Sequence, residues 1–188
     1  MAAPKRGSMH RIHRLAAIAL VAASTAACAT MNVSSHVETG LDMTAYRTFD
    51  WGPADALPTG DPRLDQDPFF KDQVTGAVEK ALAGLGVGLV PAGGKPDLLI
   101  HYHAHISQRL DVRAADRQFG YCTGDACSGN VFEYEAGSLV FDVVDARTNK
   151  VIWRGWAQDR VEPILENRDV MAKRIQEAVT RIFKQFPR

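Results

Sequence analysis

Two stretches of the chain repeat apolar residues at the three- to four-residue spacing of an amphipathic helix. The first stretch begins at Phe70 and continues through Val74, Ala77, Val78, Ala81, Leu82 and Leu85. The second covers about Asn167 to Phe186, with its stripe at Met171, Ile175, Ala178, Val179, Ile182 and Phe186. Each pattern predicts a helix that buries one face. Glycines follow the first helix and Pro187 follows the second, which suits helix ends.

Strict alternation of apolar and polar residues over positions 97–112 predicts a long strand. One face carries Leu98, Ile100, Tyr102, Ala104 and Ile106, and the other carries Leu99, His101, His103, His105 and Ser107. Residues 30–37, 46–51 and 87–90 predict shorter strands. Only one face of the long strand is expected to meet the core.

Residues 137–145 and 150–161 form the clearest predicted hairpin. Asn149 closes its turn, and asparagine tolerates the left-handed backbone that such turns require. The expected core-facing pairs join Leu139, Phe141 and Val143 to Val151, Trp153 and Ala157, whereas Trp156 falls on the opposite face.

Residues 53–68 and 113–135 lack periodicity and are predicted to be loops, the second one long or an extended hairpin tip. Strands flank one helix and precede the other, and the clearest connection is a hairpin. This order predicts an α+β fold in which an antiparallel β-sheet carries two helices packed on one face, in a single domain.

The first 27 residues have the organisation of a secretory signal. Lys5, Arg6, Arg11 and Arg14 precede an uncharged run of 13 residues from Leu15 to Ala27. A membrane-spanning helix needs about 20 apolar residues, so this run is too short to span a bilayer. Translation from Met9 in place of Met1 would give a more ordinary signal and the same mature chain.

Residues 25–28, Thr-Ala-Ala-Cys, resemble a bacterial lipobox. The resemblance implies cleavage before Cys28, diacylglycerol on its sulfur and acylation of its amino group, which together give stable anchoring. It also implies that Ala29 directs the mature protein, residues 28–188, to the outer membrane. Ordinary signal cleavage after Ala29 is the alternative.

Composition limits the possible partners. The whole chain is formally neutral, and removal of the four cations of the signal leaves 18 basic and 22 acidic residues. A mildly acidic chain without Lys/Arg clusters is not expected to bind nucleic acid. With Cys28 used for the lipid, Cys122 and Cys127 are the remaining cysteines, and a pair this close in an oxidising periplasm is expected to form a disulfide. Their CxxxxC spacing differs from the CxxC spacing of redox motifs.

The mature sequence resembles the bacterial lipoprotein family known as domain of unknown function 4136. The matching segments are residues 42–51 (DMTAYRTFDW), 96–103 (PDLLIHYH), 137–145 (GSLVFDVVD) and 149–157 (NKVIWRGWA). The final helix ending in Phe186 and Pro187 also fits. Asn149 stands where such proteins commonly have Gly, and the Cys pair stands where Gly and Tyr are frequent. The resemblance implies an α+β envelope lipoprotein with no established activity and no catalytic residues to transfer.

His101, His103 and His105 are the best candidates for chemistry. Alternation places these imidazoles on one strand face about 6.5 to 7 Å apart, where they could share a transition metal such as Zn or Cu. The alternative interpretation is a solvated polar face.

No motif indicates an enzyme. The chain has neither a Gly-x-Ser-x-Gly elbow nor a His-Glu-x-x-His helix, and its glycine cluster at 84–88 follows a helix instead of preceding one. Glu133 and Glu135 share a strand face, but they suit a solvated edge better than an acid/base pair.

The expected function is that of a structural or binding accessory module, anchored on the periplasmic face of the outer membrane, without an enzymatic activity or a cofactor. Exposed Trp156, Tyr134 and Phe119 could contact an envelope protein or peptidoglycan if they lie together. A periplasmic transition-metal-binding protein that uses the three histidines is the alternative.

Overall fold

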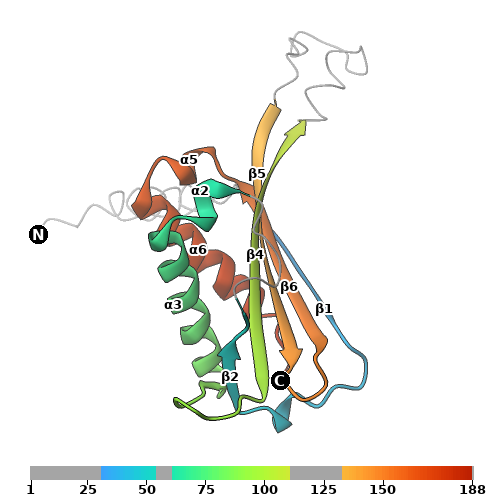
Figure 1. Cartoon of the computed structure of the whole chain (residues 1–188). Helices are drawn as coiled ribbons and strands as arrows, with labels where there is room; N and C mark the ends of the chain where they lie inside the picture. The colour runs from blue at the N-terminus through green and yellow to red at the C-terminus, as the bar shows by residue number, and fades with distance from the viewer. Residues whose placement is uncertain (1–30, 54–60, 111–132, 188) are drawn as a thin grey trace, which may run out of the picture. The chain divides into compact units, whose positions relative to one another are not determined.

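A six-stranded sheet carries two long helices on one of its faces (Figure 1). The computed structural model describes residues 31–53, 61–110 and 133–187. In chain order its elements are β1 (Asn32–Val37), the 3-10 helix η1 (Met43–Ala45), β2 (Thr48–Trp51), α2 (Pro62–Asp65), α3 (Pro68–Gly84), β3 (Gly88–Leu89), β4 (Leu98–Leu110), β5 (Glu133–Asp145), β6 (Lys150–Arg160), α5 (Glu162–Leu165) and α6 (Arg168–Phe183). The predicted α+β class, with two main helices packed against one sheet, is confirmed.

The sheet is mixed, with the strand order β1-β6-β5-β4-β2-β3. Each neighbouring pair in the series β1, β6, β5 and β4 is antiparallel, as the sequence predicted. Strand β2, however, is parallel to both β3 and β4. The long helix α3 lies between β2 and these strands in the chain, and a helical crossover returns the chain to the same end of the sheet, which makes the strands parallel.

Side-chain caps explain where the two long helices begin. Asp67 accepts a hydrogen bond from the backbone N–H of Phe69 at 3.0 Å, and Asn167 accepts two from the first turn of α6 at 2.9 and 3.1 Å. These caps satisfy N–H groups that the helices themselves leave unpaired. At the end of α3, Gly86 adopts a left-handed φ of 81°, a conformation that costs glycine little.

Aromatic rings connect the sheet to α6 across the core. Trp153 lies 5.0 Å from Phe186 and 5.4 Å from Phe183, measured between ring centroids. Phe183 in turn lies 5.4 Å from Phe141, which neighbours Tyr102 at 6.4 Å. Aromatic pairs at these separations contribute about 0.5–1.5 kcal/mol beyond the area they bury. The core-facing residues predicted for β4 and for the final helix therefore meet in one layer.

The β5–β6 hairpin confirms the role predicted for Asn149, whose φ is 55°. The prediction that Val151 faces the core is wrong. A bulge interrupts the pairing after Val143, so that Val151 pairs with Val144 and is 46% exposed, whereas Ile152 is 4% exposed. One extra residue on a strand reverses the faces of its neighbours, and alternation alone does not locate it.

The prediction of a loop over 113–135 is wrong at its end, because β5 begins at Glu133, and Glu133, Tyr134 and Glu135 pair with β4. Residues 111–132, with Cys122, Cys127 and Phe119, lie outside the described residues, as does Cys28. Within the described ranges, no helix is long and apolar enough to cross a membrane.

Two aspartates of the family-like segments hold strand ends together. Asp97 accepts hydrogen bonds from the backbone N–H groups of Arg47 and Thr48, each at 2.9 Å, and these bonds lower its pKa. Asp145 accepts the hydroxyl of Tyr46 at 2.9 Å and two N–H groups of the hairpin turn. Both residues therefore fix the strand arrangement.

Candidate functional site

The face of the sheet opposite α3 and α6 carries no helix within the described part of the chain (Figure 1). Directly paired residues of neighbouring strands point to the same face. We define the uncovered face by three rows across β4, β5 and β6, namely His101-Asp142-Arg154, His103-Val140-Trp156 and His105-Ser138-Gln158. The three predicted histidines therefore share one face, as the alternation indicated.

A charged pair, Asp142 and Arg154, lies in the row of His101 on the uncovered face. Asp142 is only 5% exposed. The Arg154 Nε and Nη2 atoms donate to its two carboxylate oxygens at 2.5 and 2.6 Å. This bidentate geometry is the strongest way to pair a guanidinium with a carboxylate, and it raises the pKa of Arg154. The Arg154 side chain is half exposed, so the pair is buried at one end and open at the other.

His103 lies beside this pair in a neutral form. Its Nε2 is 3.8 Å from Asp142 Oδ2, and its buried Nδ1 has no hydrogen-bond partner among the described residues. Burial lowers the pKa of His103 below its usual value, and this effect exceeds the opposing attraction of Asp142. At neutral pH, His103 therefore packs within this face as an uncharged side chain.

The structure separates the three histidines by environment. The His101 ring packs against Gly52, where an added Cβ would approach its Cε1 to 2.0 Å. His105 is exposed and close enough to lower the pKa of Asp61 slightly, after the larger effect of Arg63. Over the described residues, no group of three or more His, Cys, Asp or Glu side chains is arranged to hold a metal ion.

The aromatic residues considered for a contact patch are dispersed. Trp156 is half-buried in the middle of the uncovered face, paired with Val140. Tyr134 lies six positions from Val140 along β5, which is about 20 Å at the rise of a strand. There it stacks under Arg160, whose Cζ is 4.1 Å from the ring centroid. Phe119 lies outside the described residues.

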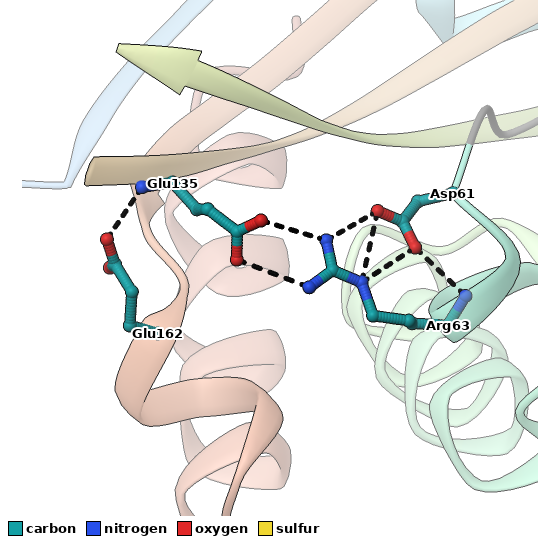
Figure 2. Close-up of polar contacts among 4 residues, drawn as sticks. All are labelled: Asp61, Arg63, Glu135 and Glu162. Carbon is teal, nitrogen blue, oxygen red and sulfur yellow. Dashed lines mark hydrogen bonds and ion pairs between the residues drawn. The ribbon is translucent and has the colours of Figure 1, made fainter. Parts of the chain in front are cut away.

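A second polar cluster, not anticipated from the sequence, joins the two short α-helices α2 and α5 to β5. Figure 2 shows Arg63 of α2 between Asp61 and Glu135. Its Nη1 and Nη2 atoms donate to Glu135 at 3.2 and 3.1 Å, and Nη2 also donates to Asp61 at 2.7 Å. Glu162 of α5 accepts the backbone N–H of Glu135 at 2.6 Å. Glu135 therefore receives a guanidinium and is not the solvated edge residue that the sequence suggested.

An apolar cavity of about 80 Å³ lies between the sheet and the helices beside this cluster. Leu64 of α2 and Leu165 of α5 form part of its wall, together with Met31, Leu139 and Met171. An apolar cavity of about 150 Å³ is known to admit benzene. The smaller volume here corresponds to a gap in packing, and the Arg63 cluster links α2 and α5, which form part of its wall, to β5.

Replacing Arg63 with alanine is expected to lower the free energy of unfolding by about 1 kcal/mol, because the guanidinium is half exposed. The hydrogen bonds of Arg63 lower the pKa of Asp61, so the folded state gains stability above the unfolded pKa of about 3.9 and loses it as pH falls through the folded value. In the Arg63→Ala variant, the free energy of unfolding should therefore fall less between pH 7 and pH 3 than in the unaltered protein. Urea unfolding at pH 7 and pH 3 measures both effects.

Arg168→Ala provides a matched control for this prediction. Arg168 is 71% exposed, lies 3.9 Å from Asp67 and has its Cζ 5.0 Å from the centroid of the Phe69 ring, contacts that are weaker than those of Arg63. Its removal should change the free energy of unfolding by less than about 0.5 kcal/mol. Equal losses in the two variants would contradict the role given to the Arg63 cluster.

The described residues thus define a single-domain α+β protein with a mixed six-stranded sheet, one helix-covered face and one uncovered, polar face. Residues 33–188 match the family described as Domain of unknown function (DUF4136). The chain belongs to this family, as its sequence motifs suggested. No curated protein matches the sequence significantly.

Two of the solved structures that align with this chain at low sequence identity share its fold. A DUF4136 family protein from Bacteroides thetaiotaomicron aligns with a TM-score of 0.53 and 15% identity, over 82% of this chain and 95% of that chain. A PDZ domain protein from Parabacteroides distasonis gives a TM-score of 0.52 and 14% identity over 84% of this chain, which spans 36% of that protein's length. A PelC dodecamer from Paraburkholderia phytofirmans aligns at a TM-score of 0.45, with 10% identity.

Proposed function

We propose that this protein is a lipoprotein of the bacterial outer membrane that binds an envelope protein through the uncovered face of its sheet. The basic and apolar signal followed by Cys28 supports lipid anchoring, and Ala29 after the cysteine supports the outer membrane as its destination. Membership of a family without established activity is compatible with a binding role. We assign the protein no catalytic residue and no cofactor.

The binding proposal is based mainly on the Asp142–Arg154 pair on the uncovered face. Asp142 is buried and holds the guanidinium in a fixed orientation through two hydrogen bonds, while half of the Arg154 side chain remains exposed. Trp156 follows on the same strand face, two residues along β6. Arginine and tryptophan dominate the binding energy of protein interfaces, particularly when neighbouring contacts fix their conformation.

The chemistry of this surface favours a protein segment rich in carbonyl and carboxylate groups. The guanidinium has five N–H donors, and Asp142 leaves part of this set available at the exposed end. Polar Ser34, Ser138 and Gln158 surround Trp156 and could pair with a partner's backbone. The Arg154 guanidinium is planar and positively charged and lies on the same face as the Trp156 indole, which favours binding of an acidic peptide segment.

Site-specific photo-crosslinking in cells tests this proposal. A photoreactive amino acid at Ser34, an exposed residue paired with Trp156, should yield an adduct with an envelope protein that mass spectrometry identifies. The same amino acid at Lys80, exposed on α3, should yield no such adduct. Adducts with peptidoglycan alone, or the same adducts from both positions, would contradict the proposal.

Lipid anchoring makes a separate prediction. The mature N-terminal peptide should carry two or three acyl chains on Cys28, and Cys28→Ser should release the protein from the membrane, because a stable anchor requires at least two chains. Mass spectrometry of the peptide and membrane fractionation measure these outcomes. The Cys122→Ser control should remain in the membrane. An unmodified peptide that begins at Thr30 would instead indicate ordinary cleavage after Ala29.

A further inference from the structure

We infer that the exposed side of α6 rests on the anionic phospholipid surface to which the protein is anchored. This inference depends on the proposed lipid anchor at Cys28 and adds an orientation and a second membrane contact to it. It follows from the distance between the anchor and the folded domain, from the place where the domain begins, and from the distribution of charge between the two long helices.

The anchor lies very close to the domain. Only Ala29 and Thr30 separate Cys28 from Met31, which is 4% exposed and belongs to the core. Three residue steps span at most about 11 Å when the chain is fully extended. Acylation of Cys28 would therefore keep Met31 within about 11 Å of the acylated residue. This distance is comparable to the Debye length at physiological ionic strength, about 8 Å, so that charges near Met31 can interact with the membrane surface.

The domain begins beside α6. Arg181 Nη2 donates to the carbonyl oxygen of Met31 at 2.9 Å, and Gln185 Nε2 donates to that of Val33 at 3.4 Å. These side chains pair with carbonyls on the first residues of an edge strand, which would otherwise lack partners on that side. The surface nearest to the anchor is consequently the flank of α6.

That surface is basic, although the mature chain is acidic overall. From Ala172 to Gln185 the sequence of α6 and its end contains four cations, Lys173, Arg174, Arg181 and Lys184, and a single carboxylate, Glu177. Glu177 pairs with both arginines, and Arg174 also lies 3.7 Å from Asp159 of β6. Lys173 and Lys184 are exposed and supply the excess of positive charge. Helix α3 has no such excess, because Lys71 and Lys80 are balanced by Asp72 and Glu79.

A few cations are sufficient for an anchored protein. Each Lys or Arg near an anionic membrane contributes about 1 kcal/mol, which is weak for a protein free in solution. The short connection to the lipid makes the contact effectively intramolecular, so that the same interactions can select one orientation. The net negative charge of the remaining surface disfavours the alternative orientations.

Amine labelling of the reconstituted lipoprotein tests the inference. The purified full mature protein is placed in vesicles of phosphatidylcholine, or in vesicles with about one third phosphatidylglycerol, and treated with a water-soluble amine reagent. Labelling of Lys173 and Lys184 should fall about threefold or more in the anionic vesicles, whereas labelling of Lys71 and Lys80 should not change. High salt should restore the labelling, because it screens surface charges.

A charge-reversal pair strengthens the test. In the Lys184→Glu variant, Lys173 should be labelled equally in both vesicle types. In the matched Lys80→Glu control, labelling of Lys173 should still fall in the anionic vesicles. Equal labelling of the lysines of α6 in the two vesicle types, or equal protection of the lysines of both helices, would overturn the inference while leaving the anchor intact. Failure of the protein to float with either vesicle type would instead overturn the lipid anchor, and the orientation with it.

Discussion

Arg154→Met is expected to lower the free energy of unfolding by about 3 kcal/mol. The substitution keeps the apolar stem of the side chain and removes both hydrogen bonds to Asp142, which is 5% exposed. A carboxylate without its partner then remains in a site with little access to water, and such groups are costly. Chemical denaturation at neutral pH measures the loss directly.

The pH dependence of this variant identifies the cause. Without Arg154, the Asp142 carboxylate would remain buried without a counter-charge at neutral pH, which is costly. Protonation of the carboxylate at low pH would remove that charge and with it most of the cost. The cost of Arg154→Met should therefore be small near pH 3 and larger at pH 7.

A double variant separates the charge from the packing. Arg154→Met combined with Asp142→Asn removes the unpaired charge, so the pair of substitutions should cost less at pH 7 than Arg154→Met alone. Equal stability losses at pH 3 and pH 7, or additive losses in the double variant, would contradict this account of the uncovered face.

Gly155→Ala is expected to lower the free energy of unfolding by about 3 kcal/mol, although it adds a single methyl group. A Cβ at this position would lie 2.2 Å from Trp153 Cη2 and 2.5 Å from Ile182 Cγ2, distances shorter than any ordinary contact. Both neighbours are fully buried and packed among the rings of α6, so neither can move without disturbing the core. Thermal unfolding followed by circular dichroism measures the effect.

The same substitution at Gly76 should have the opposite sign. Gly76 is exposed in the middle of α3, and an added Cβ would meet nothing within 4 Å. Alanine favours a helix interior over glycine by about 0.5–1 kcal/mol, so Gly76→Ala should stabilise the protein. If Gly155→Ala were as stable as the unaltered protein, the packing described between β6 and α6 would be wrong.

The family-like segments were recognisable in the sequence, but their role was not. Asp97 and Asp145 stand in two of these segments, and each accepts hydrogen bonds from chain segments distant in sequence or from the hairpin turn. No local pattern marks an aspartate that bonds to a backbone about 50 residues away. The resemblance therefore indicated the family, and the structure shows that two residues of the matching segments, Asp97 and Asp145, stabilise its fold.

The candidate site was predictable only in part. Alternation along β4 placed His101, His103 and His105 on one face, because the side-chain period of a strand is two. It could not show that Asp142 and Arg154 lie opposite His101, since the strand register depends on the pairing of three strands. The Arg63 cluster has even less sequence signal, because Arg63 and Glu135 are 72 positions apart.

By itself, the sequence determined the two amphipathic helices, the long strands, the left-handed turn at Asn149 and the α+β class, since these depend on local periodicity and backbone preference. Only the tertiary structure decided that β2 is parallel to β4, that a bulge exposes Val151, and that Asp142 is buried beneath Arg154. These features depend on contacts between segments that are distant in the sequence. Strand register, burial and the pairing of charges are therefore established only when the sheet and its helices assemble.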